Sequence, residues 1–176
     1  MPSVVSFIPT QDVHVDTFFE LAPLSGSDVV YDLGSGDGRL LFAALERGAG
    51  RAVGIELDAD LVRKAREKAK SRGVQDKISF IEADIKEVNL HDASVVLCYL
   101  TPYATAALKV KLEKELRPGS RVVMEMFPVH GWKPIKTIRK DGKKFYLYNI
   151  PPEIGEEIEN RDPILDYLNY RSSPSI

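Results

Sequence analysis

Several features that would assign this chain to a class are scarce or missing. Its 176 residues contain one cysteine, Cys98, so no disulfide forms within the chain, and the apolar neighbours of Cys98 predict a buried thiol. The three histidines are far apart and lack the spacing of metal ligands, so we expect no metal site. No apolar run approaches the ~20 residues that span a bilayer, so we expect no membrane span.

The N-terminal stretch and the charge exclude further classes. The first residues, MPSVVSFIPTQD, have no basic n-region and no long apolar run, so we expect no secretory signal and a cytoplasmic protein. The net charge of −2 gives no general attraction to nucleic acid. Lys133–Lys144 nevertheless holds six bases and one acid. This segment is interpreted either as a solvated hairpin or as a rim for an acidic partner or nucleic acid.

The stretch VVYDLGSGDGRLLFAAL, residues 29–45, carries the most information. It reads as a buried strand, a turn with glycines at 34, 36 and 38, and the start of an apolar helix. Such a turn lets a ligand approach bare backbone N–H groups. The spacing is GxGxG, whereas dinucleotide sites use GxGxxG, and an acid, Asp32, precedes it. A carboxylate favours a cationic ligand, and S-adenosylmethionine carries an ammonium and a sulfonium. The alternative is a plain glycine turn.

Acids also end the next two predicted strands. Glu56 closes the strand at 51–57, and Asp84 follows the strand at 78–83. Because the carboxyl ends of parallel strands meet at one edge of the sheet, we expect Asp32, Glu56 and Asp84 to lie together. The two oxygens of Glu56 match the vicinal hydroxyls of a ribose, and Asp84 suits the amino group of an adenine.

The remaining pattern predicts the fold. Helices are expected at about 11–22, 39–45, 58–72 and 103–116, and further strands at 93–99, 120–127, 135–139 and 143–150. Asp141-Gly142 between the last two strands is a hairpin signal. An order that alternates strand and helix as far as the fifth strand, followed by a hairpin, predicts one α/β domain. Its sheet is doubly wound, mostly parallel and Rossmann-like, with an antiparallel C-terminal hairpin strand.

These pieces resemble the seven-stranded S-adenosylmethionine-dependent methyltransferases. YDLGSGDGR, GIELDADL, FIEADI and LRPGSRVV follow that family's pattern. FIPT, LEKELRPG, GWKP and YLY point to one branch, the small archaeal-type protein lysine methyltransferases and their mitochondrial relatives. The resemblance covers about residues 6–150. It implies a methyltransferase domain at 1–150, with an N-terminal lid and helix at 1–22. Pro151-Pro152 and the serine-rich stretch at 172–175 predict a C-terminal extension at 151–176.

The resemblance also implies a set of site residues. The cofactor would be S-adenosyl-L-methionine, with S-adenosyl-L-homocysteine as product. The residues implied to hold it are Thr10, Asp32, Leu33, Gly34, Ser35, Gly36, Asp37, Gly38, Glu56, Leu57, Asp84, Ile85 and Leu100. The residues expected where the methyl group meets its acceptor are Tyr99, Thr101, Pro102 and Trp132. Related amino-methylating enzymes carry Asn/Asp-Pro-Pro-Tyr at this place, and this chain has Leu-Thr-Pro-Tyr, which disfavours transfer to a nucleobase amine.

The expected reaction is an in-line displacement in which a neutral amine attacks the sulfonium methyl, and alignment supplies most of the acceleration. An apolar, aromatic channel would favour the neutral amine by desolvation, with Tyr99, Tyr103, Phe127 and Trp132 as candidate walls. We expect a protein lysine N-methyltransferase with a protein partner. The alternatives are a methyltransferase acting on a small molecule or RNA, and a non-catalytic nucleotide-binding module, for example for NAD. The oligomeric state is left open.

Overall fold

The computed structural model describes residues 12–155, and Thr10 and the FIPT segment lie outside this range. The helices in the described part are α1 (Asp12–Leu21), α2 (Arg39–Glu46), α3 (Ala59–Ser71) and α4 (Pro102–Glu115). The strands are β1 (Val29–Leu33), β2 (Arg51–Glu56), β3 (Ile78–Glu82), β4 (Val95–Cys98), β5 (Arg121–Glu125), β6 (Trp132–Lys133), β7 (Lys136–Lys140), β8 (Lys143–Asn149) and β9 (Glu153–Ile154).

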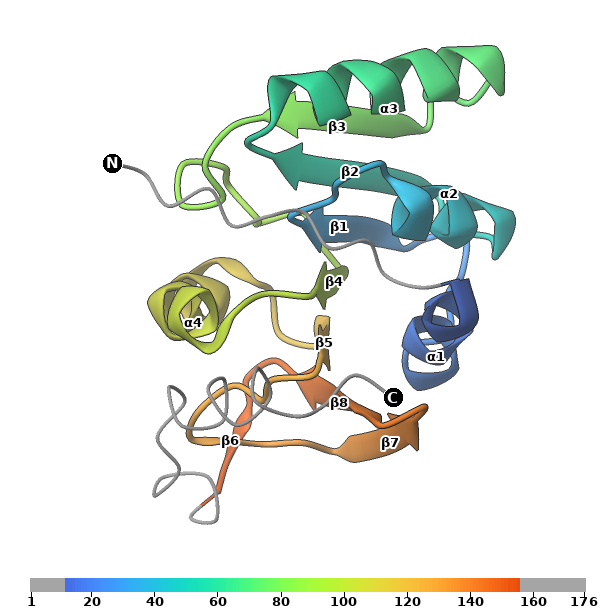
Figure 1. The fold of residues 1–176 in the computed structure, drawn as a ribbon. Helices are drawn as coiled ribbons and strands as arrows, with labels where there is room; N and C mark the ends of the chain where they lie inside the picture. The colour runs from blue at the N-terminus through green and yellow to red at the C-terminus, as the bar shows by residue number, and fades with distance from the viewer. Residues whose placement is uncertain (1–11, 156–176) are drawn as a thin grey trace.

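Seven of these strands form one sheet in the order β3-β2-β1-β4-β5-β8-β7 (Figure 1). Neighbours from β3 to β5 are parallel, and β8 is antiparallel to both β5 and β7. This confirms the predicted α/β class and the antiparallel hairpin strand. The hairpin turn lies at Asp141-Gly142, where both residues have positive φ (47° and 77°), as a two-residue turn requires.

Local signals explain where the helices begin. The Asp58 carboxylate accepts hydrogen bonds from the backbone N–H groups of Asp60 and Leu61 and starts α3 (2.9 and 3.1 Å). Thr101 caps α4 in the same way, accepting from Ala104 N at 3.4 Å, and Pro102 occupies the first helical turn. These caps fix both helices directly after strand ends, so the chain turns back at the carboxyl edge of the sheet.

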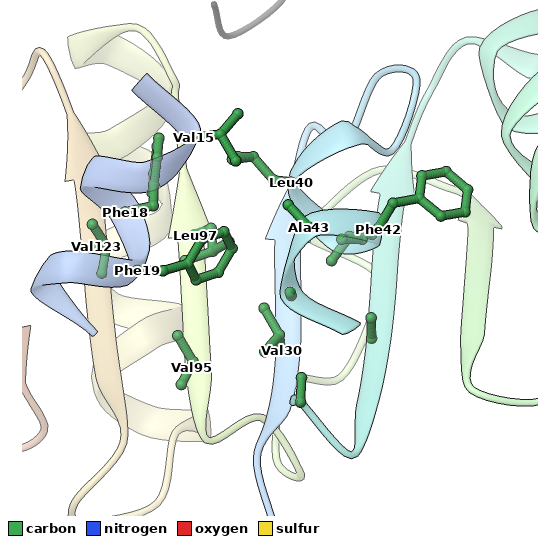
Figure 2. Close-up of a cluster of buried hydrophobic side chains, with 14 of the residues drawn as sticks. Val15, Phe18, Phe19, Val30, Leu40, Phe42, Ala43, Val95, Leu97 and Val123 are labelled. Atoms are coloured by element: carbon green, nitrogen blue, oxygen red, sulfur yellow. The ribbon is translucent and has the colours of Figure 1, made fainter. Parts of the chain in front are cut away.

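Hydrophobic clusters cover the sheet on both faces. On one face, α1, α2 and α3 pack on the strands, and Figure 2 shows Phe18 and Phe19 of α1 over Leu97 and Val123. On the other face, α4 packs through residues such as Leu108 and Leu112. Figure 1 shows α1 and α4 on opposite sides of β4 and β5. Burial on both faces explains why the parallel strands are apolar nearly throughout.

The structure corrects the predicted order in one place. No helix lies between β3 and β4, because residues 83–94 form a series of turns. Asp84 and Asn89 cap these turns by accepting hydrogen bonds from backbone N–H groups two residues later. Leu90 of this loop is fully buried in the hydrophobic cluster on the α4 face of the sheet. The loop therefore covers the part of the sheet that a helix was expected to cover.

The C-terminal part of the described chain adds a small sheet that was not predicted. β9 pairs with β6 in antiparallel register, Trp132 opposite Ile154. Residues 153–154 were assigned to the extension at 151–176, and they pair with the body of the domain. Two-residue strands carry no periodic signal, which is why the sequence did not reveal them.

We expect Phe18→Ala to lower the stability of the protein strongly. Phe18 is fully buried and lies edge-on to Phe145, with ring centroids 5.5 Å apart. Removing the ring should cost about 3–5 kcal/mol of unfolding free energy, measured by urea denaturation. Val110→Ala, at a 53% exposed position on α4, is the control and should change it little. Equal effects from the two variants would contradict this assignment of the core.

Candidate functional site

The sheet has one topological switch point, at its carboxyl edge. The strand that follows β3 in the chain, β4, lies on the other side of β1, so the chain order reverses between β1 and β4. Open α/β sheets bind ligands outside the strand ends at this point. Asp32 lies within β1, Glu56 is the last residue of β2 and Asp84 follows β3, so the fold brings the three predicted acids to this edge.

The glycine turn after β1 follows a path that side chains would strain. Gly34, Gly36 and Gly38 have φ of 89°, 52° and 77°. A Cβ on Gly38 would also lie 2.6 Å from the ring of Phe80. Glycine is therefore required at these positions by backbone conformation and, at Gly38, by contact with β3.

The backbone N–H groups of this turn are not bare, contrary to the expectation. Gly34 N and Ser35 N both donate to the carbonyl of Ile55 (2.9 and 3.0 Å), and Gly38 N donates to the carbonyl of Ser35 at 2.8 Å. Gly36 N donates to the Glu56 carboxylate at 2.9 Å. These four donors are used inside the chain. At these four positions the turn therefore offers close approach and negative charge in place of the free N–H donors with which a dinucleotide site holds a pyrophosphate.

Asp32 carries the main electrostatic feature of the site. Its side chain is buried, and burial raises its pKa to about 8, with further contributions from the charges of Glu56 and Asp37. A bound cation beside Asp32 would reverse this effect and favour the carboxylate. The surroundings of Asp32 thus fit a ligand that brings a positive charge, as the ammonium and sulfonium of S-adenosylmethionine do.

The other acid of the turn, Asp37, is already paired. Burial opposes ionisation of Asp37, but hydrogen bonds from the Arg39 guanidinium outweigh burial and hold its pKa below the usual range. The Arg39 Nη2 and Asp37 Oδ2 atoms are 2.8 Å apart. Asp37 therefore secures the start of α2, and its negative charge is matched within the chain.

The Glu56 carboxylate is fixed by three backbone groups. One oxygen accepts from Leu57 N and Asp58 N (2.8 and 3.0 Å), and the other accepts from Gly36 N. These three bonds use both lone pairs of one oxygen and one lone pair of the other, so the preoriented carboxylate can still accept from a ribose hydroxyl at the oxygen that faces Gly36. Leu57, next to it, is 69% exposed and offers an apolar surface at this edge.

Asp84 and Ile85 lie beside Glu56, because Ala83 N donates to the Glu56 carbonyl at 3.1 Å. Asp84 is half-buried, and one of its oxygens accepts from Lys86 N at 2.9 Å. Ile85 packs partly against the cluster on the α4 face. An acid and an apolar side chain therefore flank the same edge, which suits the amino group and the ring of an adenine.

The residues after β4 lie next to those of β1, since Cys98 pairs with Leu33 in the sheet. Leu100 Cδ2 is 3.6 Å from the position that a Cβ on Gly34 would take, so Leu100 covers the glycine turn. Thr101 and Pro102 form the start of α4, where the Thr101 hydroxyl serves as a cap. Tyr99 is half-buried at the strand end.

Trp132 does not join this group. Its side chain is fully buried, its ring lies edge-on to Tyr148 at 5.4 Å, and its Nε1 donates to Glu113 near the C-terminal end of α4 at 2.8 Å. Since α4 begins at the carboxyl edge, its C-terminal end lies towards the opposite edge of the sheet. The structure therefore shows Trp132 as a core residue of the described part and gives no support to its predicted place in the wall of a methyl-transfer channel.

A fourth acid lies at a strand end and was not among the predicted site residues. Glu125 closes β5, is fully buried and accepts from Lys143 Nζ at 2.6 Å. His14, also buried, places its Nδ1 3.5 Å from the same carboxylate. The signal was present in SRVVMEMF, where one acid interrupts an apolar strand near its carboxyl end, as Asp32 does in β1.

Comparison with known proteins agrees with this geometry. The profile of the ANTKMT methyltransferase domain matches residues 32–136. A protein-lysine N-methyltransferase of Saccharolobus islandicus (strain REY15A) is 38% identical over 83% of this chain and 94% of its own. The adenine nucleotide translocase lysine N-methyltransferase of Mus musculus is 35% identical over 68% of this chain, which spans about half (52%) of that protein.

A solved structure is also closely similar. It is described as an RNA methyltransferase from Salinibacter ruber in complex with S-adenosyl-L-homocysteine, and it is 42% identical with a TM-score of 0.80. The match covers 86% of this chain and 99% of that one. Among the described residues, no helix is long and apolar enough to cross a membrane.

We expect Asp32→Asn to stabilise the ligand-free protein at pH 8 by several degrees in melting temperature. Between the ordinary pKa near 3.8 and the folded value of about 8, the folded state binds more protons than the unfolded state, so rising pH lowers the free energy of unfolding. The amide removes this loss, and its advantage should vanish near pH 4. Exposed Asp76→Asn is the control. An equal gain at pH 4 and pH 8 would contradict the assignment.

We expect Trp132→Phe to lower the melting temperature while leaving the affinity for S-adenosylhomocysteine unchanged. The variant loses the hydrogen bond to Glu113 and part of a buried ring, at a cost of about 1–3 kcal/mol. Thermal denaturation and calorimetric titration measure the two quantities. Weaker binding of S-adenosylhomocysteine with an unchanged melting temperature would show that Trp132 belongs to the binding site and would contradict its assignment to the core.

Proposed function

The chain belongs to the ANTKMT methyltransferase domain family, and on that premise we propose that it transfers a methyl group from S-adenosylmethionine to lysine side-chain amines of proteins. The single observation that carries the proposal is the set of acids at the carboxyl edge of the sheet. The buried Asp32 carboxylate would be stabilised by a bound cation, and Glu56 and Asp84 present oriented hydrogen-bond acceptors at the same edge. The lysine acceptor is supported by the relatives of Saccharolobus islandicus and Mus musculus, which are protein lysine methyltransferases.

The residues at this edge divide the binding of the cofactor among them. Asp32 would hold the methionine ammonium, Glu56 the ribose hydroxyls, and Asp84 with Ile85 the adenine. Leu100 lies over the glycine turn and would exclude water from that side of the methionine part. Thr10 lies outside the described residues, and its role near the methionine part stays a prediction.

The chain's contribution to the reaction is alignment and exclusion of water. When bound, S-adenosylmethionine would supply the methyl group: the acceptor ammonium first gives a proton to water, the neutral nitrogen would then form the new C–N bond as the C–S bond breaks, and the products would be S-adenosylhomocysteine and a methylated ammonium. A lysine amine has an ordinary pKa of about 10.4, so the site must favour its neutral form. Half-buried Tyr99 and buried Phe127 follow β4 and β5 at the edge where the acceptor would enter.

RNA is a second candidate acceptor, because one similar solved structure is described as an RNA methyltransferase. The exposed bases of strand β7 and its surroundings, among them Lys136, Arg139 and Lys140, would suit a polyanion. Leu100-Thr101-Pro102-Tyr103 lacks the leading amide or acid that transfer to a nucleobase amine would use. We therefore place protein lysine first, and we retain a cytoplasmic location as part of the proposal.

We expect tritiated S-adenosylmethionine to label protein when this enzyme is added to a cell extract. The label should survive ribonuclease, appear as methyl-lysine after acid hydrolysis, and disappear when the extract's lysines are acetylated beforehand. Asp32→Ala, checked for folding by circular dichroism, should give no label, because the methionine ammonium loses its partner. Label that ribonuclease removes would overturn the lysine proposal in favour of RNA.

A further inference from the structure

A second group of polar side chains is buried at the carboxyl end of β5, and we call it the Lys143 cluster: His14, Tyr99, Glu125 and Lys143. The Lys143 ammonium lies 2.6 Å from Glu125 Oε1 and 5.0 Å from the centroid of the Tyr99 ring. Glu125 has no exposed side-chain surface, and Lys143 is 16% exposed. Removing an ammonium from water carries a desolvation penalty, which the carboxylate and the aromatic face offset only in part. The presence of such a group therefore calls for a role in the fold or in the site.

The position of the cluster relates it to the acceptor. Met124 of β5 pairs with Cys98 of β4, so Glu125 and Tyr99 are the next residues on adjacent strands at the edge that holds the cofactor residues. Met126, directly after Glu125, has φ of 70°, a left-handed conformation that is unusual for a side chain other than glycine. Such strain is often found beside functional sites. The cluster therefore lies next to the β1–β4 switch point, on the side away from the adenine residues.

The charges within the cluster balance. Glu125 of β5 and the Tyr99 ring after β4 contact Lys143, and His14 of α1 feels its charge. Asp141 of the β7–β8 turn and Lys140 of β7 act on His14 from the other side. Burial, and then the charge of Lys143, lower the pKa of His14 below its ordinary 6.5, so the imidazole is neutral at pH 7. Glu125 and Lys143 then form a neutral pair.

The sign of each charge matters to an amine acceptor. A buried carboxylate without a partner would hold an incoming lysine as the ammonium, which has no lone pair with which to attack. A resident ammonium beside the carboxylate cancels that attraction, and desolvation of the bound amine then favours its uncharged form.

We propose that the Glu125–Lys143 pair lies directly beneath the acceptor site, and that the Lys143 ammonium, by neutralising Glu125, keeps the incoming lysine amine uncharged and nucleophilic. This inference rests on the proposed function, because it requires a lysine acceptor. Lys143 acts here through the charge of Glu125 and is a positioning residue, with no direct part in the bond changes.

The test is the pH dependence of kcat/KM for methyl transfer to the acceptor protein recovered from the extract labelling. Lys143→Met removes the positive charge 2.6 Å from Glu125, so the ascending limb of the profile should move up by about one pH unit, a roughly tenfold loss at pH 7. Glu125→Gln leaves the ammonium uncompensated, so the limb should move down. The double variant Glu125→Gln with Lys143→Met is neutral again, and its limb should return towards the wild-type position.

Two further variants separate charge from shape. Lys143→Arg keeps the positive charge and should keep the position of the limb, whatever its effect on the rate. Lys144→Met removes the neighbouring, half-buried lysine and should leave the profile unchanged.

The outcomes distinguish this inference from the proposed function. The inference alone would be overturned if the wild type methylates lysine but the ascending limb of the pH profile stays in place in Lys143→Met and Glu125→Gln. A shift of the limb in the same direction in both variants would overturn it as well. A purely structural ion pair would give that result, with lower stability and lower rates at every pH. Absence of any transfer to lysine by the wild type would overturn the proposed function and the inference together.

Discussion

Asp32 is a carboxylic acid kept away from water inside a parallel sheet, and the site depends on this. Burial raises its pKa to about 8, and the nearby carboxylates of Glu56 and Asp37 add to the effect. A protein has little reason to retain an unsupported acid at such a place, because an apolar residue would be more stable there. The free-energy cost of burying Asp32 is explained if a cationic ligand binds beside it. The carboxyl edge of the sheet supplies oriented hydrogen-bond acceptors for the rest of such a ligand.

The backbone of the glycine turn supports the same conclusion from a different direction. The N–H groups of Gly34, Ser35, Gly36 and Gly38 are directed inward, to the Ile55 carbonyl, to the Ser35 carbonyl and to Glu56, so they are not presented to an anion. A pyrophosphate would meet carboxylates in place of donors. This arrangement separates the chain from dinucleotide-binding modules with a related topology, and it accords with the chain's membership of a methyltransferase family.

Much of the fold and the acids of the candidate site could be predicted from the sequence, because they follow from hydrophobic periodicity and from short local motifs. The buried strands were continuous apolar runs, Asp141-Gly142 fixed the hairpin, and the acids at 32, 56 and 84 followed from where strands ended. Contacts between distant segments could not be read in the same way. Trp132 looked like a channel wall, yet its place against Tyr148 depends on a two-residue strand. The pairing of Lys143 with Glu125 depends on β8 lying beside β5, which no local pattern encodes.

The most direct test of the central claim is calorimetric titration of S-adenosylhomocysteine near pH 7 in two buffers of different ionisation enthalpy, for the wild type and Asp32→Asn. If the ligand ammonium binds ionised Asp32, the wild type should release close to one proton per site, because a pKa of about 8 leaves most of Asp32 protonated beforehand. Asp32→Asn should bind much more weakly and release none. Tight binding by both proteins, with no proton released by either, would contradict the account.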